Sequence, residues 1–189
     1  MAGRLHDKVA LITGAGCIGP GWGNGRAMAV LFAREGAKIF AADKNGEAMK
    51  ETLERVREFG GTIQAHECDA TESASWAAMV AACLKAYGRI DILVNNVGGS
   101  AAGGPVEMAE EVWDAQIDYN LKSVFLGCKH VLPVMEKQGG GAIVNLASTS
   151  GLRWTGAAQV DARLTIAPPP CFSMTGSTCL QPRNTLFRL

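Results

Sequence analysis

A glycine-rich stretch near the N-terminus has a composition suited to binding phosphate. Residues 13–27 read TGAGCIGPGWGNGRA, and the stretch contains no GK[ST] motif, which argues against a P-loop for nucleoside triphosphates. Between a strand and a helix, such a turn presents backbone N–H groups and the positive end of the helix dipole to a phosphate group. Glycine-rich turns also occur for structural reasons alone. In this context, the stretch predicts a pyrophosphate site.

A carboxylate follows the glycine-rich stretch at a matching distance. Asp43 ends the second apolar run and lies 18 residues after Gly25. An acid at this position accepts hydrogen bonds from the adenosine ribose of NAD, and its charge repels the 2′-phosphate of NADP. Asp43 could also be a turn residue before Asn45 and Gly46; taken alone, the two interpretations are even. Together with the glycines, Asp43 predicts NAD as the cofactor and makes NADP less favourable, a preference that Lys44 weakens.

The elements that would position these residues alternate between strands and helices. Short apolar runs predict strands at residues 8–13, 37–43, 62–69, 90–96 and 141–148. Helical periodicity predicts helices at residues 25–35, 47–59 and 75–87, and one long or broken helical region at 106–135. Because most of the strands are apolar throughout, we expect an α/β fold with a doubly wound parallel sheet covered on both faces. Ligands of such sheets bind at the carboxyl ends of the strands.

Composition excludes several other classes of protein. With 189 residues and a formal net charge of zero, the chain is expected to form one domain without an affinity for nucleic acid. It contains no apolar run of membrane-spanning length and no N-terminal apolar segment. None of the six cysteines forms a CxxC pair or lies near a histidine at zinc-ligand spacing, which predicts free thiols and no metal site. We expect a cytoplasmic protein.

Five motifs in order resemble the short-chain dehydrogenase/reductase family. The resemblance covers approximately residues 6–158. It rests on Thr13 and Gly14 with Gly23, Asn24 and Gly25; on Asp69 and Ala70 in CDAT; on Asn95, Val97 and Gly98 in NNVGG; on Asn120 in DYNLKSVF; and on Ser148 in IVNLASTSG.

The resemblance implies a cofactor role for the first three of these motifs. Asp69 would contact the adenine amine with Ala70 beside it, and Asn95 would begin a turn that packs against the cofactor. The glycine loop departs from the family, because eight residues separate Gly14 from Gly23 where family members have three. We assign Gly23 and Gly25 as the later glycines and expect the extra segment to bulge near the phosphates. A register that uses the glycines at 19 and 21 leaves the start of the helix unexplained.

The resemblance also implies the chemistry, which is hydride transfer between a nicotinamide and a small alcohol or ketone. Ser148 would orient the substrate oxygen, and Asn120 would hold a water in the proton relay. By the same resemblance, a Tyr-x-x-x-Lys pair should follow Ser148 by about a dozen residues. The tyrosine would transfer the proton, and the nearby lysine would lower the tyrosine pKa from its ordinary value of about 10. The sequence there reads DARLTIAPPP, and no tyrosine follows Tyr119.

Composition changes at this point in the chain. Four of the seven prolines follow residue 161, and proline does not fit inside a helix. The segment from residue 161 onward also has no apolar periodicity. We therefore divide the chain into a dinucleotide-binding domain, residues 1–158, and an atypical, irregular tail, residues 159–189. We expect the fifth strand to be an edge of the sheet, with one apolar face uncovered.

Three interpretations of function remain open. The first is an NAD-dependent oxidoreductase of the short-chain type, with turnover by this chain in doubt. The alternatives are a non-catalytic NAD-binding fragment and the product of a frame-disrupted gene. Family members form homo-oligomers through the helices at residues 106–135, but the expected partner helix is missing from this sequence, so the oligomeric state is open.

Overall fold

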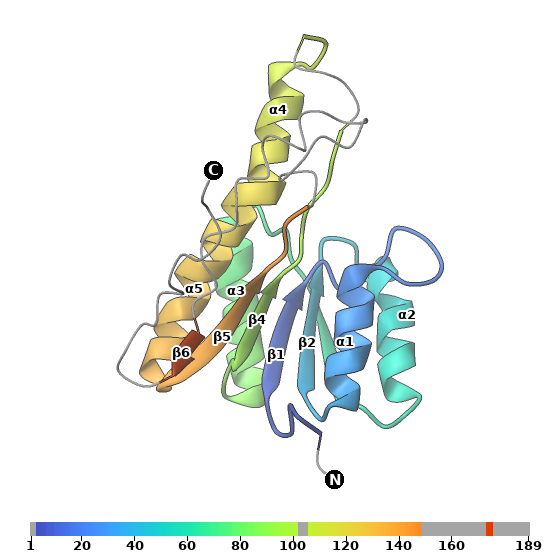
Figure 1. Cartoon of the computed structure of the whole chain (residues 1–189), viewed down its shortest axis with the longest axis vertical. Helices are drawn as coiled ribbons and strands as arrows, with labels where there is room; N and C mark the ends of the chain where they lie inside the picture. Colours follow the sequence, from blue (N-terminus) through green and yellow to red (C-terminus); the bar gives the residue numbers. More distant parts are fainter. Residues whose placement is uncertain (1–2, 102–105, 149–172, 176–189) are drawn as a thin grey trace, which may run out of the picture.

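The protein forms a twisted sheet with helices on both faces, as Figure 1 shows. The computed structural model describes residues 3–101, 106–148 and 173–175. The strand order is β3-β2-β1-β4-β5-β6. The first five strands are parallel, which confirms the predicted doubly wound α/β fold. The strands are β1 (Val9–Thr13), β2 (Lys38–Asp43), β3 (Ile63–Glu67), β4 (Ile92–Asn95), β5 (Gly140–Asn145) and β6 (Ser173–Thr175).

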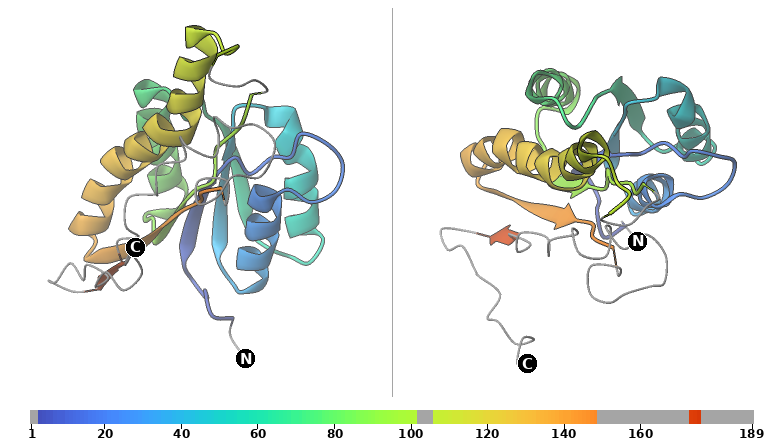
Figure 2. Two further views of the ribbon diagram at one scale, coloured as in Figure 1. Left: turned by 45° about the horizontal axis from the view of Figure 1, so that its top comes forward. Right: turned by 90° about the horizontal axis from the view of Figure 1, so that it is seen from above.

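The helices follow the strands in alternation, and the right-hand view of Figure 2 shows several of them close to end-on. They are α1 (Asn24–Arg34), α2 (Gly46–Arg57), α3 (Ser73–Tyr87), α4 (Glu110–Ile117), the π-helix η1 (Asp118–Lys122) and α5 (Ser123–Lys137). The predicted helical region at residues 106–135 is therefore divided by a π-helical turn. Such turns are rare and often lie at functional sites.

Two hydrophobic clusters cover the two faces of the sheet. Alternate residues of each strand point to opposite faces, so Leu11 packs with α3 and α5, while Ala10 and Ile12 pack with α1 and α2. Trp76 on α3 is fully buried in the first cluster, and its indole N–H donates to the Ala70 carbonyl at 2.9 Å. The segment that follows β3 is thereby fixed relative to α3.

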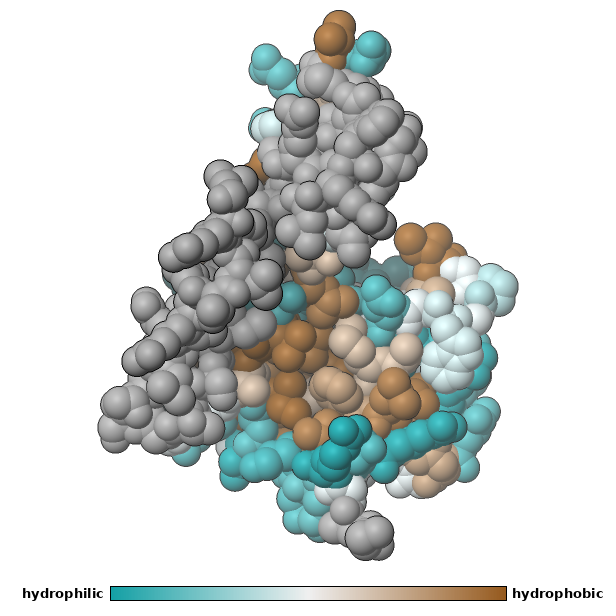
Figure 3. All heavy atoms as spheres, in the orientation of Figure 1, coloured by the Kyte–Doolittle hydropathy of each residue, from teal (hydrophilic) through white to brown (hydrophobic). Residues whose placement is uncertain are grey.

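The β5 side of the sheet differs in part from the prediction. Strand β6 pairs antiparallel with β5, with Gly140 opposite Thr175, so the expectation that β5 is the edge is wrong over these positions. Among the described helices, α5 is the one that packs against β5. On the other face, Val144 is 39% exposed, and Figure 3 shows hydrophobic atoms gathered in the middle of that view. Ile92 and Val94 on the neighbouring strand β4 are buried on this face, so the expected exposure of apolar surface is met at Val144 and not at these positions.

Candidate functional site

A pocket of about 800 Å³ lies at the carboxyl ends of β1, β2 and β4 and beside the segment that follows β3. All the predicted cofactor-binding residues line it except Thr13 and Asn95. The lining from that set is Gly14, Gly23, Asn24, Gly25, Asp43, Asp69, Ala70, Val97 and Gly98. Residues far apart in the sequence thus meet at the edge of the sheet where ligands of this fold bind.

The glycines form a narrow approach between β1 and α1. Helix α1 begins at Asn24 with Gly23 as its N-cap, as the chosen register requires. A Cβ on Gly25 would collide with the carbonyl oxygen of Gly14, so no other residue fits here without a shift of the backbone. Gly14 has a φ of +62°, in the left-handed region that glycine adopts without strain. By contrast, a Cβ on Gly19 would have no neighbouring atom within 4 Å, so a larger side chain would fit at this position.

Asp43 connects the end of β2 to the glycine loop. Its Oδ2 accepts a hydrogen bond from the Gly16 N–H at 2.9 Å, and its Oδ1 accepts one from the Asn45 N–H at 3.0 Å. The Asn45 side chain then caps α2 by accepting from the N–H groups of Glu47 and Ala48. Asp43 is therefore both a turn residue and a pocket residue, and the two interpretations of the sequence do not exclude each other.

Asp69 sits in a charged arrangement on the pocket wall. Its Oδ2 lies 2.6 Å from the Lys44 Nζ, and its Oδ1 accepts hydrogen bonds from the Thr71 N–H and hydroxyl at 3.0 and 2.7 Å. The hydrogen bond from Lys44, together with those from Thr71, lowers the pKa of the Asp69 carboxyl to about 2. Burial raises the pKa of the adjacent Cys68 thiol to about 11, so this pocket cysteine stays a thiol near neutral pH.

Thr13 and Asn95 lie behind the pocket wall, and both are 2% exposed. The Thr13 hydroxyl donates to the Val94 carbonyl at 3.2 Å. Asn95 donates from Nδ2 to Asn145 Oδ1 at 2.8 Å, which ties β4 to β5, while its buried Oδ1 has no hydrogen-bond partner among the described residues. The neighbouring Asn96 is the one that faces the pocket. Thr13 and Asn95 therefore support the wall from behind.

Asn96 is a pocket residue that the sequence analysis did not single out. Its Nδ2 donates to the carbonyls of Thr13 and Gly14, at 3.1 and 2.9 Å, and so holds the end of β1 against the end of β4. The NNVGG motif contained the signal, since either asparagine could have faced the site. Other lining residues that were not assigned individually as cofactor-binding are Gly16, Cys17, Ile18, Lys44, Asn45, Ala48, Cys68, Thr71, Ala115, Asp118 and Tyr119.

The two predicted catalytic residues do not line this pocket. Asn120 lies in η1, where its Oδ1 accepts from the Gly99 N–H at 3.1 Å and its Nδ2 donates to the carbonyls of Gly99 and Gln116, each at 2.9 Å. Ser148 is exposed and follows the end of β5. Asn120 thus fixes the loop after β4 to the π-helical turn. The positions directly after Val160, where the Tyr-x-x-x-Lys pair was expected, lie within residues 149–172, which are outside the described residues.

The tyrosine nearest the pocket is Tyr119, which lines it beside Asp118. Lys122 lies three residues further on, and its Nζ is 3.4 Å from Asp118 Oδ1. The ammonium group is therefore paired with a carboxylate of the same helical turn.

The pocket's donors and shape fit a dinucleotide. The N-terminus of α1 opens into it through Gly23, Asn24 and Gly25, and the first N–H groups of a helix have no intrahelical acceptor. The glycines leave backbone open to a ligand, and the Asp43 and Asp69 carboxylates on the wall supply hydrogen-bond acceptors of the kind that the hydroxyls and amine of a dinucleotide require. In the part of the chain that the structure describes, no three His, Cys, Asp or Glu side chains gather as metal ligands, and no helix is long and apolar enough to cross a membrane.

The sheet order and the pocket at its carboxyl edge define a Rossmann-like α/β protein. Comparison with known proteins identifies the family: residues 8–159 match the family model described as short chain dehydrogenase. The chain belongs to the short-chain dehydrogenase/reductase family of oxidoreductases.

Relatives with assigned names include both dehydrogenases and reductases. Over 152 residues the chain is 38% identical to the 2,5-dichloro-2,5-cyclohexadiene-1,4-diol dehydrogenase LinX of Sphingobium indicum, covering 80% of this chain and 59% of LinX. Over 149 residues it is 39% identical to the 3-oxoacyl-[acyl-carrier-protein] reductase FabG of Thermotoga maritima, covering 79% of this chain and 58% of FabG. The chain therefore spans less than two thirds of the length of these relatives.

Solved structures agree with this assignment. A short-chain dehydrogenase/reductase from Burkholderia xenovorans superposes with a TM-score of 0.84 at 60% identity, covering 87% of this chain and 65% of that one. Levodione reductase superposes with a TM-score of 0.77 at 32% identity, covering 85% of this chain and 61% of that one.

Proposed function

We propose that the pocket binds NAD, with the pyrophosphate at the N-terminus of α1 and the adenosine between Asp43 and Asp69. The observation that carries this proposal is that one pocket is lined by the glycine loop, the ends of β2 and β4 and the segment after β3. Asp43 would accept hydrogen bonds from the ribose hydroxyls through lone pairs that Gly16 and Asn45 leave available. Its negative charge favours NAD over NADP, because a 2′-phosphate beside it would be repelled.

The reaction class that we propose is the interconversion of an alcohol and a carbonyl. The bound nicotinamide would supply or accept the hydride. Asn120 holds the loop after β4 against η1 and so shapes the wall beside the nicotinamide end. Ser148, exposed at the end of β5, would donate a hydrogen bond to the substrate oxygen. Among the relatives, LinX is named as a dehydrogenase of a cyclic diol and FabG as a reductase of a 3-oxoacyl group, so the substrate that we propose is a small alcohol or ketone.

A second candidate function is NAD binding without efficient turnover. The observation that favours it is the sequence after Ser148, which has no tyrosine. General acid–base groups contribute about 10²- to 10⁴-fold to the rates of reactions that need proton transfer. We therefore propose that this 189-residue chain binds the dinucleotide and turns over slowly, even though the family is one of oxidoreductases.

Two assays on the same preparation separate these functions. Calorimetric titration with NADH measures binding. Turnover is measured as the rise of the NADH absorbance with NAD⁺ and a panel of cyclic diols, and as its fall with NADH and a panel of β-ketoesters. Binding without turnover supports the second candidate. Binding with turnover that Ser148→Ala reduces supports the first. A folded protein that binds neither NADH nor NADPH contradicts both.

A further inference from the structure

Residues 15–22, which contain the five extra residues and which we call the inserted segment, form one wall of the pocket. Gly16, Cys17 and Ile18 line the pocket directly, and the Ile18 side chain is fully exposed. Figure 1 shows the segment as a loop that leaves the end of β1, projects beside α2 and returns to α1. Glycines make such a loop costly to order, since each fixed backbone loses conformational entropy. A wall built from this segment therefore needs an anchor.

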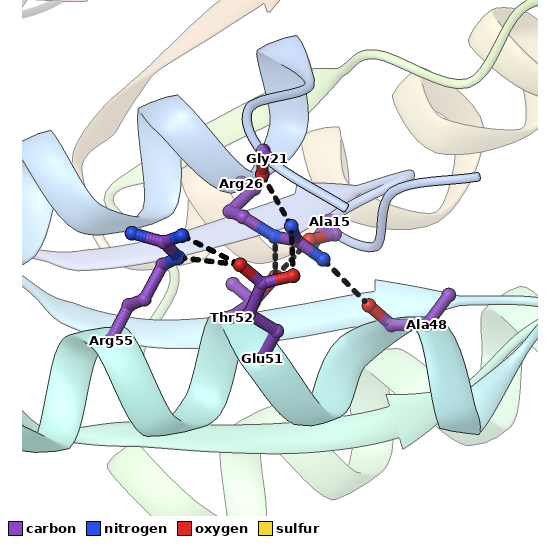
Figure 4. A network of polar contacts seen from close by, with 7 residues as sticks. All are labelled: Ala15, Gly21, Arg26, Ala48, Glu51, Thr52 and Arg55. Carbon is purple, nitrogen blue, oxygen red and sulfur yellow. Dashed lines mark hydrogen bonds and ion pairs between the residues drawn. The ribbon is translucent and has the colours of Figure 1, made fainter. Parts of the chain in front are cut away.

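The anchor is the buried side chain of Arg26 in the first turn of α1. The side chain is 2% exposed, and Figure 4 shows it between the loop and α2. Its Nη1 donates to the Gly21 carbonyl and lies 2.5 Å from Glu51 Oε2, and its Nη2 donates to the Ala48 carbonyl at 3.3 Å. Its Nε donates to the Thr52 hydroxyl at 3.1 Å. The planar guanidinium thus connects the returning end of the loop to α2 at several points.

The outgoing end of the loop is held by the same group of residues. The Thr52 hydroxyl, which accepts from Arg26, donates to the Ala15 carbonyl at 2.9 Å. Arg55 donates from Nε and Nη2 to Glu51 Oε1, at 2.9 and 2.6 Å, and its guanidinium carbon lies 4.4 Å from the centroid of the Trp22 ring. We call Arg26, Glu51, Thr52, Arg55 and Trp22 the loop clamp. It fixes both ends of the inserted segment and leaves the tip at Gly19 with open space around its Cβ position.

We infer that Arg26 is a positioning residue for dinucleotide binding, which it serves by holding residues 15–22 as a preformed pocket wall through the loop clamp. This inference rests on the proposed function. None of the five clamp residues lines the pocket, so their effect on a ligand would pass through the loop. A preformed wall gives tighter binding of the ligand, because the conformational entropy of ordering the loop is lost during folding and not during binding.

The test compares clamp variants with a matched pair at the other end of the same helices. Arg34 in α1 lies over the Phe59 ring, with its guanidinium carbon 5.3 Å from the centroid. Neither residue lines the pocket. Trp22→Ala and Arg26→Met open the clamp, while Phe59→Ala and Arg34→Met remove a similar cation–aromatic contact away from the loop. The 189-residue chain is titrated with NADH by calorimetry, far below each variant's unfolding midpoint.

The clamp variants should bind NADH more weakly, while the matched pair should not. We expect a Kd about fivefold higher for Trp22→Ala and about tenfold or more higher for Arg26→Met, since buried partners lose their donor. Arg26→Lys should recover only part of the affinity, because a lysine lacks the planar fork. Phe59→Ala and Arg34→Met should stay within about twofold of the parent chain, because their contact lies outside the pocket wall.

Hydrogen exchange separates positioning from general stability. In the NADH-free clamp variants, amides of residues 15–22 should exchange faster while those of β1 and β4 keep their protection, and saturating NADH should slow the exchange again. If Arg26→Met does not fold, Trp22→Ala decides the question. Trp22 is 58% exposed, so its truncation should leave the protein folded.

The outcomes distinguish this inference from the proposed function. Weaker binding confined to the clamp variants supports it. If the parent chain binds NADH and the clamp variants bind equally well, the inference is wrong and the proposed function stands. If the folded parent chain binds neither NADH nor NADPH, the proposed function fails and the inference fails with it.

Discussion

Replacing Asp43 by asparagine should change the cofactor preference of the pocket. The carboxylate accepts from the N–H groups of Gly16 and Asn45 through its two oxygens. Asparagine is nearly the same size but neutral, and it can accept through one oxygen only. Asp43→Asn therefore removes the charge and one of the two hydrogen bonds, while the path of β2 is kept.

The expected magnitude follows from Coulomb's law. A carboxylate and a phosphate carrying about two negative charges, about 5 Å apart in water, repel each other by about 1.7 kcal/mol. This energy corresponds to a factor of roughly 15 in Kd. Salt screening reduces it, and the lower dielectric of a pocket increases it. The ratio of the Kd for NADPH to the Kd for NADH should thus fall about tenfold in the variant. Loss of one charged hydrogen bond should lower the free energy of unfolding by about 1–2 kcal/mol.

Calorimetric titration with both cofactors measures the ratio, and urea unfolding measures stability. Glu67→Gln is the matched control, because Glu67 is the register partner of Asp43 on β3 and is not among the residues that line the pocket. The control makes the same change of charge and should leave the ratio unchanged. An unchanged ratio in Asp43→Asn, in a folded protein that binds NADH, would refute the assignment of Asp43 to the ribose.

Two further predictions concern the glycine loop and the charged pair on the pocket wall. Gly25→Ala should reduce NADH affinity at least about tenfold, because the new Cβ would collide with the Gly14 carbonyl. Gly19→Ala should leave the affinity within about twofold, since no atom lies near its Cβ position. Equal effects of the two variants in calorimetry would contradict the assigned register. The Asp69 carboxyl has a pKa of about 2 in the folded protein, below the ordinary value of 3.8. Its contribution to the free energy of unfolding should therefore be fully present well above pH 3.8 and be lost as the pH falls towards 2. Carboxyl-carbon NMR titration should show this pKa raised in Lys44→Met, and an unchanged pKa would mean that Lys44 is not the cause.

The sequence predicted the five parallel strands and part of the pocket lining because those features are local. Apolar runs identified the five parallel strands, and helical periodicity placed the start of α1 at residue 25, one position after its observed start at Asn24. The carboxyl ends of neighbouring parallel strands then meet at one edge, so the motifs after β1, β2, β3 and β4 came together as expected.

Other features depend on tertiary contacts that no local pattern encodes. The loop clamp joins the inserted segment to α2. The i,i+4 spacing of Glu51 and Arg55 indicates that these two side chains meet, but nothing in the sequence indicates that Arg26 reaches them. Which of Asn95 and Asn96 faces the pocket depends on the direction of a turn. The π-helical turn adds one residue to a helical period, and it thereby brings Tyr119 to the pocket wall and Asn120 to the Gly99 loop.

We propose that this chain folds a pocket for NAD. The most direct test is a calorimetric titration of the 189-residue chain with NADH, repeated with NADPH. The structure predicts saturable binding of NADH that is at least about tenfold tighter than binding of NADPH, given the charge of Asp43. A folded protein that binds neither cofactor, or that binds NADPH more tightly, would contradict the claim.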